Sequence, residues 1–455
     1  MALIIAGDRS GVGKTTITLA ILAVLARQGK RVQSFKVGPD YIDPMFHSGA
    51  TGIACRNLDP VLTSPAYIRD CFQRYGNNAE CVVIEGVMGL FDGLYDPDKS
   101  NCLNDYGSTA HIARILNLPV VLVLDCSSLS SSIAAIAYGY ANLDPEVKIA
   151  GVILNKIASD RHKELLETAL NSIKMPIMGV LRRNSQITIP DRHLGLIPSD
   201  ELPKINSIFS RLADRAQTSF NWDKLFPLIK TNISFPDNPP IFPSSKVKIA
   251  IAKDAAFNFY YQDNLDILAK LGAELIDWSP INDRDIPKDI QGLYFGGGFP
   301  EVFARQLAAN KNVLEQLKQL ILGGIPTYAE CGGLMYLCEQ LVDLKQKYWS
   351  MVGVIPSTVS METKLTLGYR KAIALQDTSL IQAQETITGH EFHRSQIQTP
   401  PNNPLWQLQG FHQSSPQIIE GWQVENLHAS YLHIHWGENQ HLAQRFINNC
   451  ENYKI

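Results

Sequence analysis

A glycine-rich loop directly behind the first apolar segment constrains this chain more than any other feature. Residues 2–6 form a short apolar run, which leads into Gly7-Asp-Arg-Ser-Gly11-Val-Gly13-Lys14-Thr15-Thr16 and then into an amphipathic stretch over 16–28. A strand, a glycine loop and a helix in this order are the context that a phosphate-binding loop requires. Glycines let backbone N–H groups turn toward phosphate oxygens, and the helix N-terminus adds positive potential. The start of the chain therefore predicts a nucleotide site.

The residue types in this loop predict individual roles. Lys14 would reach the β- and γ-phosphates of ATP, and the Thr15 hydroxyl would ligate Mg²⁺. Gly11, Gly13 and Thr16 would complete the ATP-binding set. The spacing before Gly-Lys-Thr is one residue longer than in the common loop, and it resembles the loop of dethiobiotin synthetase and its relatives. The alternative is a glycine-rich turn that holds no phosphate.

Buried strands and helical patterns alternate along both halves of the chain. Apolar runs over 31–36, 81–85, 119–125 and 149–155 are separated by amphipathic stretches, and a second series starts at Val247-Lys-Ile-Ala-Ile-Ala252. This alternation predicts an α/β fold built on parallel sheets. A helical and then proline-rich segment separates the two series, which is typical of a linker. The predicted division is a P-loop domain over 1–196, a linker over 197–245 and a second α/β domain over 246–448.

Composition excludes several classes of function. A net charge of −3 with no basic block argues against a nucleic-acid partner. The apolar segment over 133–140 is far too short to cross a bilayer, so no membrane association is expected. The eight cysteines form no CxxC pair, which predicts neither a zinc site nor a disulfide framework. We therefore expect a cytoplasmic protein.

Two acidic clusters follow predicted strands of the first domain. Asp40 and Asp43 stand close behind the strand that ends near Lys36, and they could hold metal, contact substrate or simply cap a turn. Glu85 ends the next strand, where a second Mg²⁺ ligand belongs, and Asp92 follows on a glycine-rich loop. The sequence therefore predicts Thr15, Asp43 and Glu85 as the metal set.

Three further polar residues of the first domain are weaker candidates. The Asn155 amide offers both a donor and an acceptor to adenine, although a helix-capping asparagine is an equal alternative. Arg192 and His193 could meet a phosphate or a substrate carboxylate, although such residues more often lie at the surface.

A cysteine dominates the second domain. Cys331 lies between an apolar strand and a predicted helix over 334–342, which is the position of a nucleophile elbow. The helix N-terminus is expected to lower the pKa of the thiol. Backbone N–H groups of Gly297 and Gly298, together with that of Gly332, could form an oxyanion hole.

Two histidines near the end of the chain could activate this cysteine. His433 and His435 alternate along a predicted strand over 429–433 and beyond, so they would share one face and either could pair with Cys331. The remaining cysteines are interpreted as core, with Cys338 on the same helix as Cys331. A polar segment around His390-Glu391-Phe392-His393 could ligate metal, but a strand end that packs or guides substrate is favoured.

Taken together, these motifs resemble the cobyrinic acid a,c-diamide synthase family of vitamin B12 biosynthesis over nearly the whole chain. The markers are GDRSGVGKTT, KVGPDYIDP, EGVMGLFDG, RHLGL, GGGFPE, AECGG, GHEFHRS and ASYLHIHW. The resemblance implies a dethiobiotin-synthetase-like P-loop domain for ATP and corrinoid, followed by a class I glutamine amidotransferase-like domain. It implies an ATP-, Mg²⁺- and glutamine-dependent ligase that amidates the a- and c-carboxylates of cobyrinate through acyl phosphates.

The resemblance also implies roles for particular residues. His433, rather than His435, would increase the nucleophilicity of Cys331. Asp40, Asp43, Glu85 and Asp92 match the acidic positions that serve Mg²⁺ and substrate, and the Tyr41–Ile42 pair would position the corrinoid. Ordinary class I glutaminases carry Pro-Glu behind the histidine, whereas Ile434-His435 follows here. The resemblance therefore implies a Cys–His dyad.

Rival interpretations differ in substrate or in class. Hydrogenobyrinate or nickel-sirohydrochlorin could be the substrate of the same chemistry. A homodimer is possible. A P-loop of this type also occurs in nucleotide-switched ATPases that bind partner proteins, but the Cys331 and His433 pair argues against that class. A ligase for a cell-wall precursor usually carries the two activities on separate chains.

Overall fold

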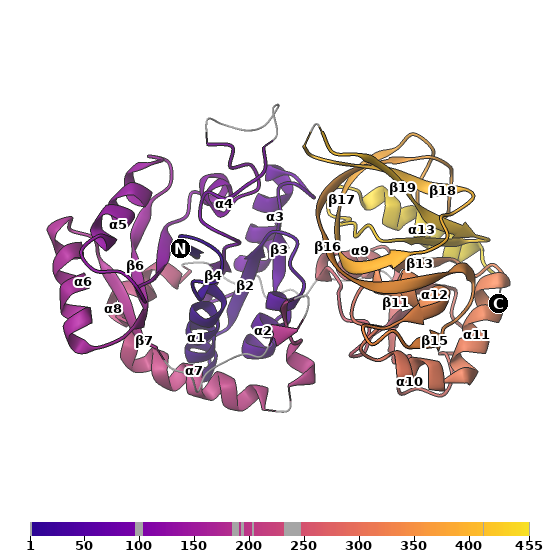
Figure 1. The fold of residues 1–455 in the computed structure, drawn as a ribbon, viewed down its shortest axis with the longest axis horizontal. Coiled ribbons are helices and arrows are strands. Elements are labelled where there is room, and N and C mark those ends of the chain that lie inside the picture. The colour runs from indigo at the N-terminus through magenta and orange to yellow at the C-terminus, as the bar shows by residue number, and fades with distance from the viewer. Residues whose placement is uncertain are drawn as a thin grey trace. The chain divides into compact units, whose positions relative to one another are not determined.

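The protein consists of two compact units, residues Met1–Asn238 and Pro239–Ile455. The computed structural model describes residues 2–95, 103–183, 191–192, 195–202, 204–231, 247–412 and 414–454 (Figure 1). Each unit contains its own sheet and its own buried apolar core. Within the described residues, no helix has both the length and the apolar character that crossing a bilayer requires.

The first unit is built on a seven-stranded sheet in the order β3-β2-β4-β1-β5-β6-β7. All of its strand pairs are parallel. The P-loop strand β1 lies between β4 and β5. The chain runs from β1 to β2 on one side of β1 and crosses to the other side between β4 and β5, so the strand order reverses at β1. In open α/β sheets, ligands bind outside the carboxyl ends of the strands at such a switch point. The strands are β1 (Leu3–Gly7), β2 (Val32–Val37), β3 (Arg56–Leu58), β4 (Cys81–Glu85), β5 (Val120–Asp125), β6 (Ile149–Ile157) and β7 (Ile177–Arg182).

Helices cover this sheet because its strands are apolar on both faces. Residues of β1, β4 and β5 are completely or almost completely buried. The helices are α1 (Lys14–Arg27), α2 (Ile42–Thr51), α3 (Pro65–Gly76), α4 (Thr109–Leu116), α5 (Ile133–Asn142), α6 (Asp160–Ser172), α7 (Ile205–Ser219) and α8 (Trp222–Ile229). Two short strands, β8 (Asp191–Arg192) and β9 (Gly195–Leu196), pair with each other, and a 3₁₀ turn spans Ser199–Glu201.

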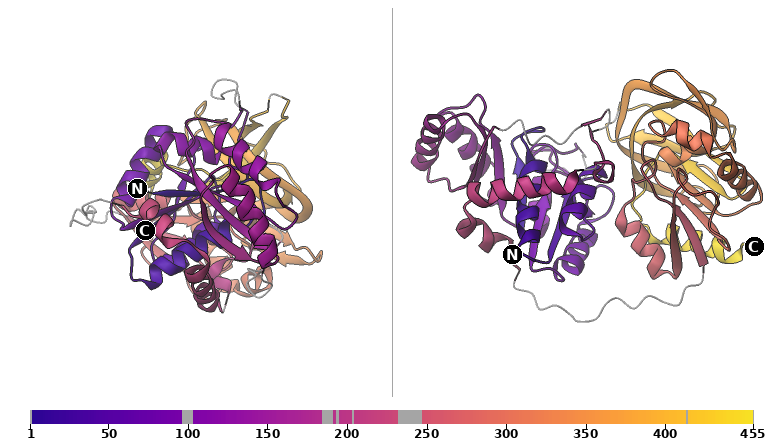
Figure 2. Two further views of the ribbon diagram at one scale, coloured as in Figure 1. Left: turned by 90° about the vertical axis from the view of Figure 1, so that its left-hand side faces the viewer. Right: turned by 90° about the horizontal axis from the view of Figure 1, so that it is seen from below.

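Helices α7 and α8 fall within the segment predicted as a linker, yet they are part of the first unit. Helix α7 packs along α1, which also contacts α2 (Figure 2). Its buried residues Ile208, Leu212 and Ala216 recur at helical spacing, so one apolar face is removed from water. The first unit thus extends beyond its sheet strands.

The second unit contains an 11-stranded mixed sheet, ordered β11-β10-β12-β13-β20-β19-β18-β16-β14-β15, with β17 paired to β16. Strands β11, β10, β12, β13 and β20 run parallel, whereas β19 and β18 continue the sheet antiparallel. The strands are β10 (Val247–Ala252), β11 (Ala273–Trp278), β12 (Gly292–Phe295), β13 (Thr327–Glu330), β14 (Cys338–Val342), β15 (Tyr348–Ser350), β16 (Ile355–Ala374), β17 (Thr386–Ile397), β18 (Pro404–Gly410), β19 (Gln417–Val424) and β20 (Leu427–Ser430). The helices are α9 (Gln262–Lys270), α10 (Ala304–Ala309), α11 (Lys311–Leu322), α12 (Gly332–Leu337) and α13 (Gln440–Asn452).

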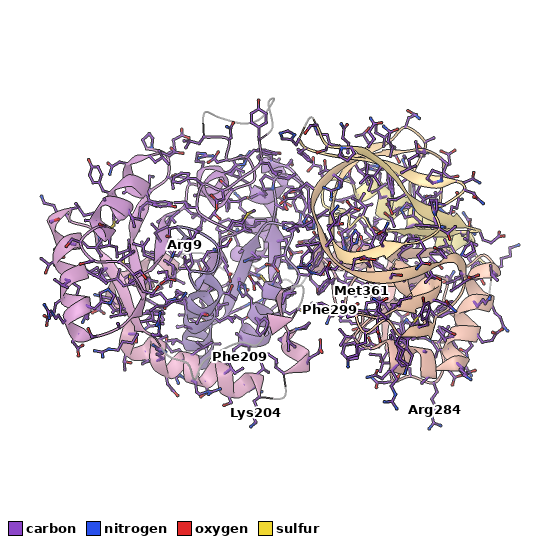
Figure 3. All side chains as sticks on the ribbon, viewed as in Figure 1. Arg9, Lys204, Phe209, Arg284, Phe299 and Met361 are labelled. Atoms are coloured by element: carbon purple, nitrogen blue, oxygen red, sulfur yellow. The ribbon has the colours of Figure 1, made fainter. Side chains whose placement is uncertain are left out.

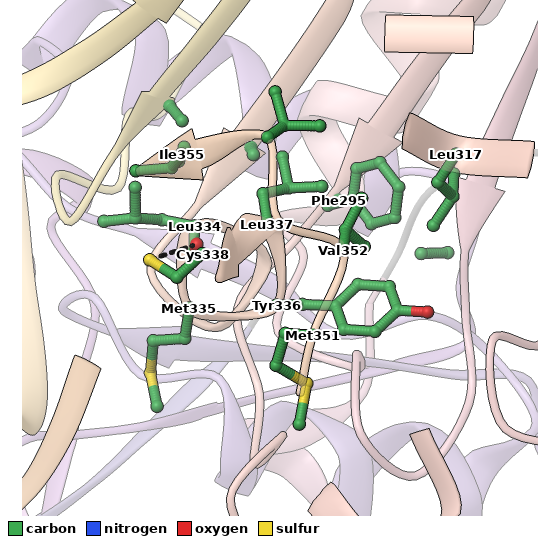
Figure 4. Packing of buried hydrophobic residues seen from close by; sticks show 14 of the residues in the cluster. Phe295, Leu317, Leu334, Met335, Tyr336, Leu337, Cys338, Met351, Val352 and Ile355 are labelled. Carbon is green, nitrogen blue, oxygen red and sulfur yellow. Dashed lines mark hydrogen bonds between the residues drawn. The ribbon is translucent and has the colours of Figure 1, made fainter. Parts of the chain in front are cut away.

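Two local predictions in this unit are wrong. The helix behind Cys331 ends at Leu337, and Cys338 starts strand β14, which pairs with β15 and β16. Pairing with these strands satisfies the backbone groups that a longer helix would have bonded internally. Cys338 is nevertheless core, as predicted, and its thiol donates to the Leu334 carbonyl at 3.4 Å (Figure 4). The last parallel strand ends at Ser430, so His433 and His435 lie beyond it.

Candidate active sites

The P-loop is folded as a turn between β1 and α1. Gly11 and Gly13 adopt φ angles of 77° and 100°, a region that L side chains rarely enter. Lys14 is the first residue of α1, and its ammonium donates to the carbonyls of Met88 at 2.5 Å and Arg9 at 3.2 Å. The side chain of Arg9, which Figure 3 labels, is half exposed at 56%. The loop backbone and its lysine are thus held in place by backbone contacts.

The predicted metal ligands meet at one point. The Thr15 hydroxyl lies 2.6 Å from Glu85 Oε1 and 3.2 Å from Asp43 Oδ2. Glu85 reaches this point because it ends β4, directly beside β1 in the sheet. Asp43 reaches it from the first turn of α2. The structure therefore brings together three residues that lie far apart in the sequence.

A buried lysine balances these carboxylates. Lys36 is the register partner of Glu85 across β2 and β4, and its ammonium lies 3.0 Å from Glu85 Oε1 and 2.6 Å from Asp43 Oδ2. Burial opposes ionisation of Glu85, but Lys36 and His47 hold its pKa well below the usual range. Burial, and then the neighbouring carboxylate of Asp40, raise the pKa of Asp43 to about 8. Glu85 is therefore the firmly charged member of the pair.

The alternatives for Asp40 and Asp43 separate in the structure. Asp40 Oδ1 accepts the backbone N–H groups of Ile42 at 2.9 Å and Asp43 at 3.1 Å, so Asp40 caps helix α2. Its other oxygen lies 3.6 Å from the Lys36 ammonium. Asp43 instead faces Thr15. Tyr41 and Ile42, predicted to position the corrinoid, are both buried at the start of α2, with 4% and 5% of their surface exposed.

Sequence reasoning missed His47. Its Nε2 lies 2.7 Å from Glu85 Oε2, and the side chain is completely buried. Burial lowers the pKa of His47, but Cys55 and Glu85 outweigh it and raise that pKa to about 10. The spacing of four residues from Asp43 on α2 is the signal that could have identified it, because such residues share a helix face. Lys36 and His47 thus hold opposite oxygens of the same carboxylate.

These residues suit Mg²⁺. Magnesium prefers oxygen ligands and commonly takes one or two carboxylates, with phosphates and water completing its shell. Thr15, Glu85 and Asp43 offer oxygens only, beside the loop predicted to hold phosphates. Across the described ranges, no group of three or more His, Cys, Asp or Glu side chains forms a metal cluster. The donor set fits an ion that is held largely by a nucleotide.

The remaining candidates of the first unit have more local contacts. Asp92 is exposed and accepts the Gly89 N–H at 2.7 Å, which closes a turn beside the loop lysine. The Asn155 amide donates to the Val12 carbonyl at 2.8 Å, and its oxygen accepts the Lys156 N–H, so Asn155 supports the P-loop from β6. Thr16 is half-buried in the first turn of α1. Only the backbone of Arg192 is described, in β8, and His193 lies outside the described residues.

In the second unit, Cys331 occupies a strained turn between β13 and α12. Its φ of 46° and ψ of −98° lie outside the regions that L residues favour, a feature that clusters at functional sites. The Cys331 N–H donates to the Ser430 carbonyl at 2.8 Å, and Sγ lies 3.8 Å from the Phe392 carbonyl. The prediction of a lowered thiol pKa is wrong. Burial, followed by Glu301 and Glu330, raises the pKa of Cys331 and outweighs the N–H of Gly332.

The predicted oxyanion glycines surround this turn. A methyl group added to Gly332 would lie 2.9 Å from the backbone nitrogen of Gly298. One added to Gly297 would lie 2.6 Å from His433 Cε1 and 3.3 Å from its Nε2. Gly298 itself has a φ of 152°, and a methyl group there would approach the Ala256 carbonyl to 2.1 Å. The glycine loop, the cysteine turn and the His433 ring are therefore packed together.

His433 and His435, which follow β20 in the sequence, have different surroundings. His433 is completely buried, and its Nδ1 lies 3.5 Å from Glu330 Oε2. His435 Nε2 lies 3.7 Å from Asp263, its Nδ1 accepts the Gly437 N–H at 3.1 Å, and its ring packs on Tyr261. The prediction that both project from one strand face is wrong, because the chain has left the sheet at Ser430. His433 is the one beside the glycine loop.

The polar segment around His390 forms strand β17. Arg370 on β16 bonds Glu391 at 2.5 Å, and the His393 ring stacks on Tyr431 with centroids 3.9 Å apart. His390 exchanges backbone hydrogen bonds with His433, each at 2.9 Å. This strand therefore packs over the cysteine turn and fixes the backbone of His433.

Comparison with known proteins identifies relatives over the whole chain. A family model for the CobQ/CobB/MinD/ParA nucleotide binding domain matches residues 3–197, and one for the CobB/CobQ-like glutamine amidotransferase domain matches 248–441. A cobyrinate a,c-diamide synthase from Synechococcus sp. is 54% identical over 99% of this chain and 98% of its own length. One from Synechocystis sp. is 51% identical over 99% and 93%. A hydrogenobyrinate a,c-diamide synthase from Streptomyces coelicolor is 38% identical over 98% and 97%.

Replacing Lys36 with methionine should destabilise the first unit strongly. The change leaves Asp43 without its ammonium partner and Glu85 with His47 as its remaining cationic partner, and breaking a buried pair in this way costs about 3–5 kcal/mol. Urea unfolding followed by circular dichroism measures the loss. The matched control is Lys30→Met, which breaks an exposed ion pair with Glu80 and should hardly move the midpoint. Equal midpoints for the two variants would contradict the structural role given to Lys36.

Proposed function

This chain belongs to the cobyrinate a,c-diamide synthase family, and we propose that it amidates the a- and c-carboxylates of cobyrinate, with ATP as energy source and glutamine as nitrogen donor. The observation that supports the proposal is that one chain carries two different candidate sites. One combines a P-loop with Thr15, Asp43 and Glu85, and the other places Cys331 and His433 beside the same glycine loop. A nucleotide-switched partner-binding ATPase would need only the first.

The first site supports activation of a carboxylate. A carboxylate is a poor acceptor for ammonia because its oxygen is a poor leaving group. Transfer of the γ-phosphoryl group of ATP to one carboxylate oxygen gives an acyl phosphate and ADP. Lys14, once it exchanges its carbonyl partners for phosphate oxygens, stabilises the charge of that transfer. Thr15, Asp43 and Glu85 would hold Mg²⁺, which would supply positive charge to the phosphoryl transfer.

The second site supports hydrolysis of the glutamine amide. His433 takes the thiol proton as Cys331 attacks the carboxamide carbon, and the N–H groups of Gly298 and Gly332 stabilise the oxyanion. The Gly297 N–H, also predicted for the oxyanion hole, instead donates to the Phe259 carbonyl at 3.3 Å. His433 then gives the proton to the leaving nitrogen, which departs as ammonia. Water hydrolyses the thioester to glutamate. Burial raises the pKa of Cys331, so the thiol depends on a neighbouring base to take its proton. Ammonia then displaces phosphate from the acyl phosphate to form the amide.

Several residue roles stay predictions within this proposal. Asp40, Tyr41, Ile42, Asp92, Arg192 and His193 would contact the corrinoid or the acyl phosphate. Gly11, Gly13, Thr16 and Asn155 would bind ATP. Asn155 retains a second amide hydrogen and a second lone pair for adenine beside its loop contacts. The domain division at 196 and 245, a cytoplasmic location and a homodimer also stay predictions.

The substrate is tested by mass spectrometry. Cobyrinic acid, hydrogenobyrinic acid and nickel-sirohydrochlorin are incubated in parallel with the protein, MgATP and glutamine. The proposal expects conversion of cobyrinic acid to a diamide with little product from the others. The similarity to the Streptomyces coelicolor protein makes hydrogenobyrinate the second candidate. Glutamine hydrolysis without amidation of any of the three would overturn the proposed acceptor.

Replacing Cys331 with alanine should abolish glutamine use but leave ammonia-dependent amidation intact. The nucleophile lies in the second unit, whereas the P-loop and its carboxylates lie in the first. Diamide formation measured with glutamine and with ammonium chloride separates the two activities. A folded variant that has lost both would contradict a model of two separate sites.

Replacing Lys14 with alanine should remove amidation with either nitrogen source. Loss of the cation that stabilises phosphoryl transfer is expected to slow that step by roughly 1,000-fold, the lower end for a group of this kind. Diamide formation is followed by mass spectrometry, and glutamine hydrolysis by glutamate release serves as the control for a folded second unit. Undiminished diamide formation would show that the loop does not hold the transferred phosphate.

A further inference from the structure

We propose that Glu330, the residue immediately before the nucleophile, is the third member of the glutaminase site: its carboxylate orients His433 and supports the positive charge that this ring acquires. The inference rests on the proposed glutaminase function. It replaces the Cys–His dyad that the sequence implies with a triad whose acid comes from strand β13. Glu330 touches neither substrate nor thiol in this scheme, so it is a positioning residue.

Glu330 lies on the Nδ1 side of the His433 imidazole. Glu330 Oε2 lies 3.5 Å from His433 Nδ1, and both side chains are buried, with exposures of 1% and 0%. The opposite edge of the ring, at Cε1 and Nε2, faces Gly297 of the loop that packs on the cysteine turn. A proton on Nδ1 directed at Glu330 leaves Nε2 to accept from a thiol. Contacts of this kind are commonly longer in a substrate-free site and tighten during the reaction.

The carboxylate is anchored from its other side. Glu330 Oε1 accepts the Tyr328 hydroxyl at 2.5 Å and the Ile434 N–H at 3.1 Å, while the Tyr294 hydroxyl lies 3.5 Å from Oε2. The bond to Ile434 ties the acid to the residue next to His433. The position of the acid and the position of the histidine are therefore coupled through the backbone.

His433 is the cation that this buried acid requires. Among the residues that the structure describes, the ion pairs of Glu330 include no lysine or arginine, and His433 is its basic partner. A buried carboxylate without a cation is costly, so Glu330 stabilises the positive charge that His433 acquires when it takes the thiol proton. Other titratable groups near the ring are Cys331 and His390 of β17. Burial lowers the pKa of His390 to about 3, which keeps it neutral.

His435, two residues after His433 in the sequence, cannot supply the carboxylate that orients the ring. His435 stands where ordinary class I glutaminases carry glutamate, and it contacts Asp263 and the Gly437 N–H instead. The strand register explains why Glu330 can take this role. Glu330 on β13 is the register partner of Ser430 on β20, and the segment after Ser430 brings His433 and Ile434 back to Glu330. The sheet thus delivers a carboxylate to the ring from the neighbouring strand.

The test compares Glu330→Gln with Glu420→Gln. Glu420 is also a buried carboxylate of this unit, and it accepts from the Ser430 hydroxyl and the Tyr431 N–H rather than from His433. Glutamate release from glutamine is measured from about pH 5 to about pH 9, a range that spans histidine titration. Glu330→Gln should lower kcat by roughly 100-fold, the lower bound for losing general-base function, with little change in KM. Glu420→Gln should stay close to wild type.

The pH profile distinguishes a positioning role of Glu330 from a purely structural role. A base must be neutral to accept the thiol proton, so activity should fall toward acid pH. The Glu330 carboxylate stabilises the charged form of the neighbouring ring, so its removal should move the acid limb of kcat/KM to lower pH in Glu330→Gln. An unchanged limb, or a loss of kcat equal to that of Glu420→Gln, would overturn the proposal. Failure of the wild-type protein to hydrolyse glutamine would instead overturn the proposed function.

Discussion

Parallel strands end at a common edge, and both units of this protein depend on that constraint for their chemistry. In the first unit, β1 delivers the P-loop, β4 delivers Glu85, and β2 delivers Lys36, because register makes Lys36 and Glu85 neighbours. In the second unit, β12 leads into the glycine loop and β13 into Cys331. Residues that are distant in the sequence are therefore brought together by the strand order of each sheet.

Buried charge is the second condition that both sites must satisfy. An ionised carboxylate removed from water needs a cation or several hydrogen bonds. Glu85 has Lys36 at one oxygen and His47 at the other, so it stays ionised beside the P-loop threonine Thr15. Glu330 obtains two hydroxyl groups and a backbone N–H, which leaves His433 to meet its charge. The same electrostatic requirement thus fixes Glu85 beside the P-loop in one unit and, under the proposed mechanism, orients His433 in the other.

The sequence predicts best what depends on local order. The strand–loop–helix context of Gly7 to Thr16, the strand over 81–85 and the elbow at Cys331 all follow from neighbours in the chain, and the family resemblance is confirmed by relatives over its full length. Two contacts that depend on tertiary packing could not be predicted. His47 carried only an i, i+4 spacing to Asp43, and Glu330 carried no signal, because its partner lies about a hundred positions away. The segment behind Leu337 was misjudged because β16 captures it as a strand.

The central claim is that the first site activates a carboxylate as an acyl phosphate before ammonia arrives. Cobyrinic acid labelled with ¹⁸O in its carboxylates is incubated with the protein, MgATP and glutamine, and the inorganic phosphate is analysed by mass spectrometry. In an acyl phosphate, one carboxylate oxygen becomes the bridging oxygen and leaves with phosphate. The account predicts one ¹⁸O in phosphate for every amide formed. Phosphate without ¹⁸O, accompanied by amide formation, would contradict it.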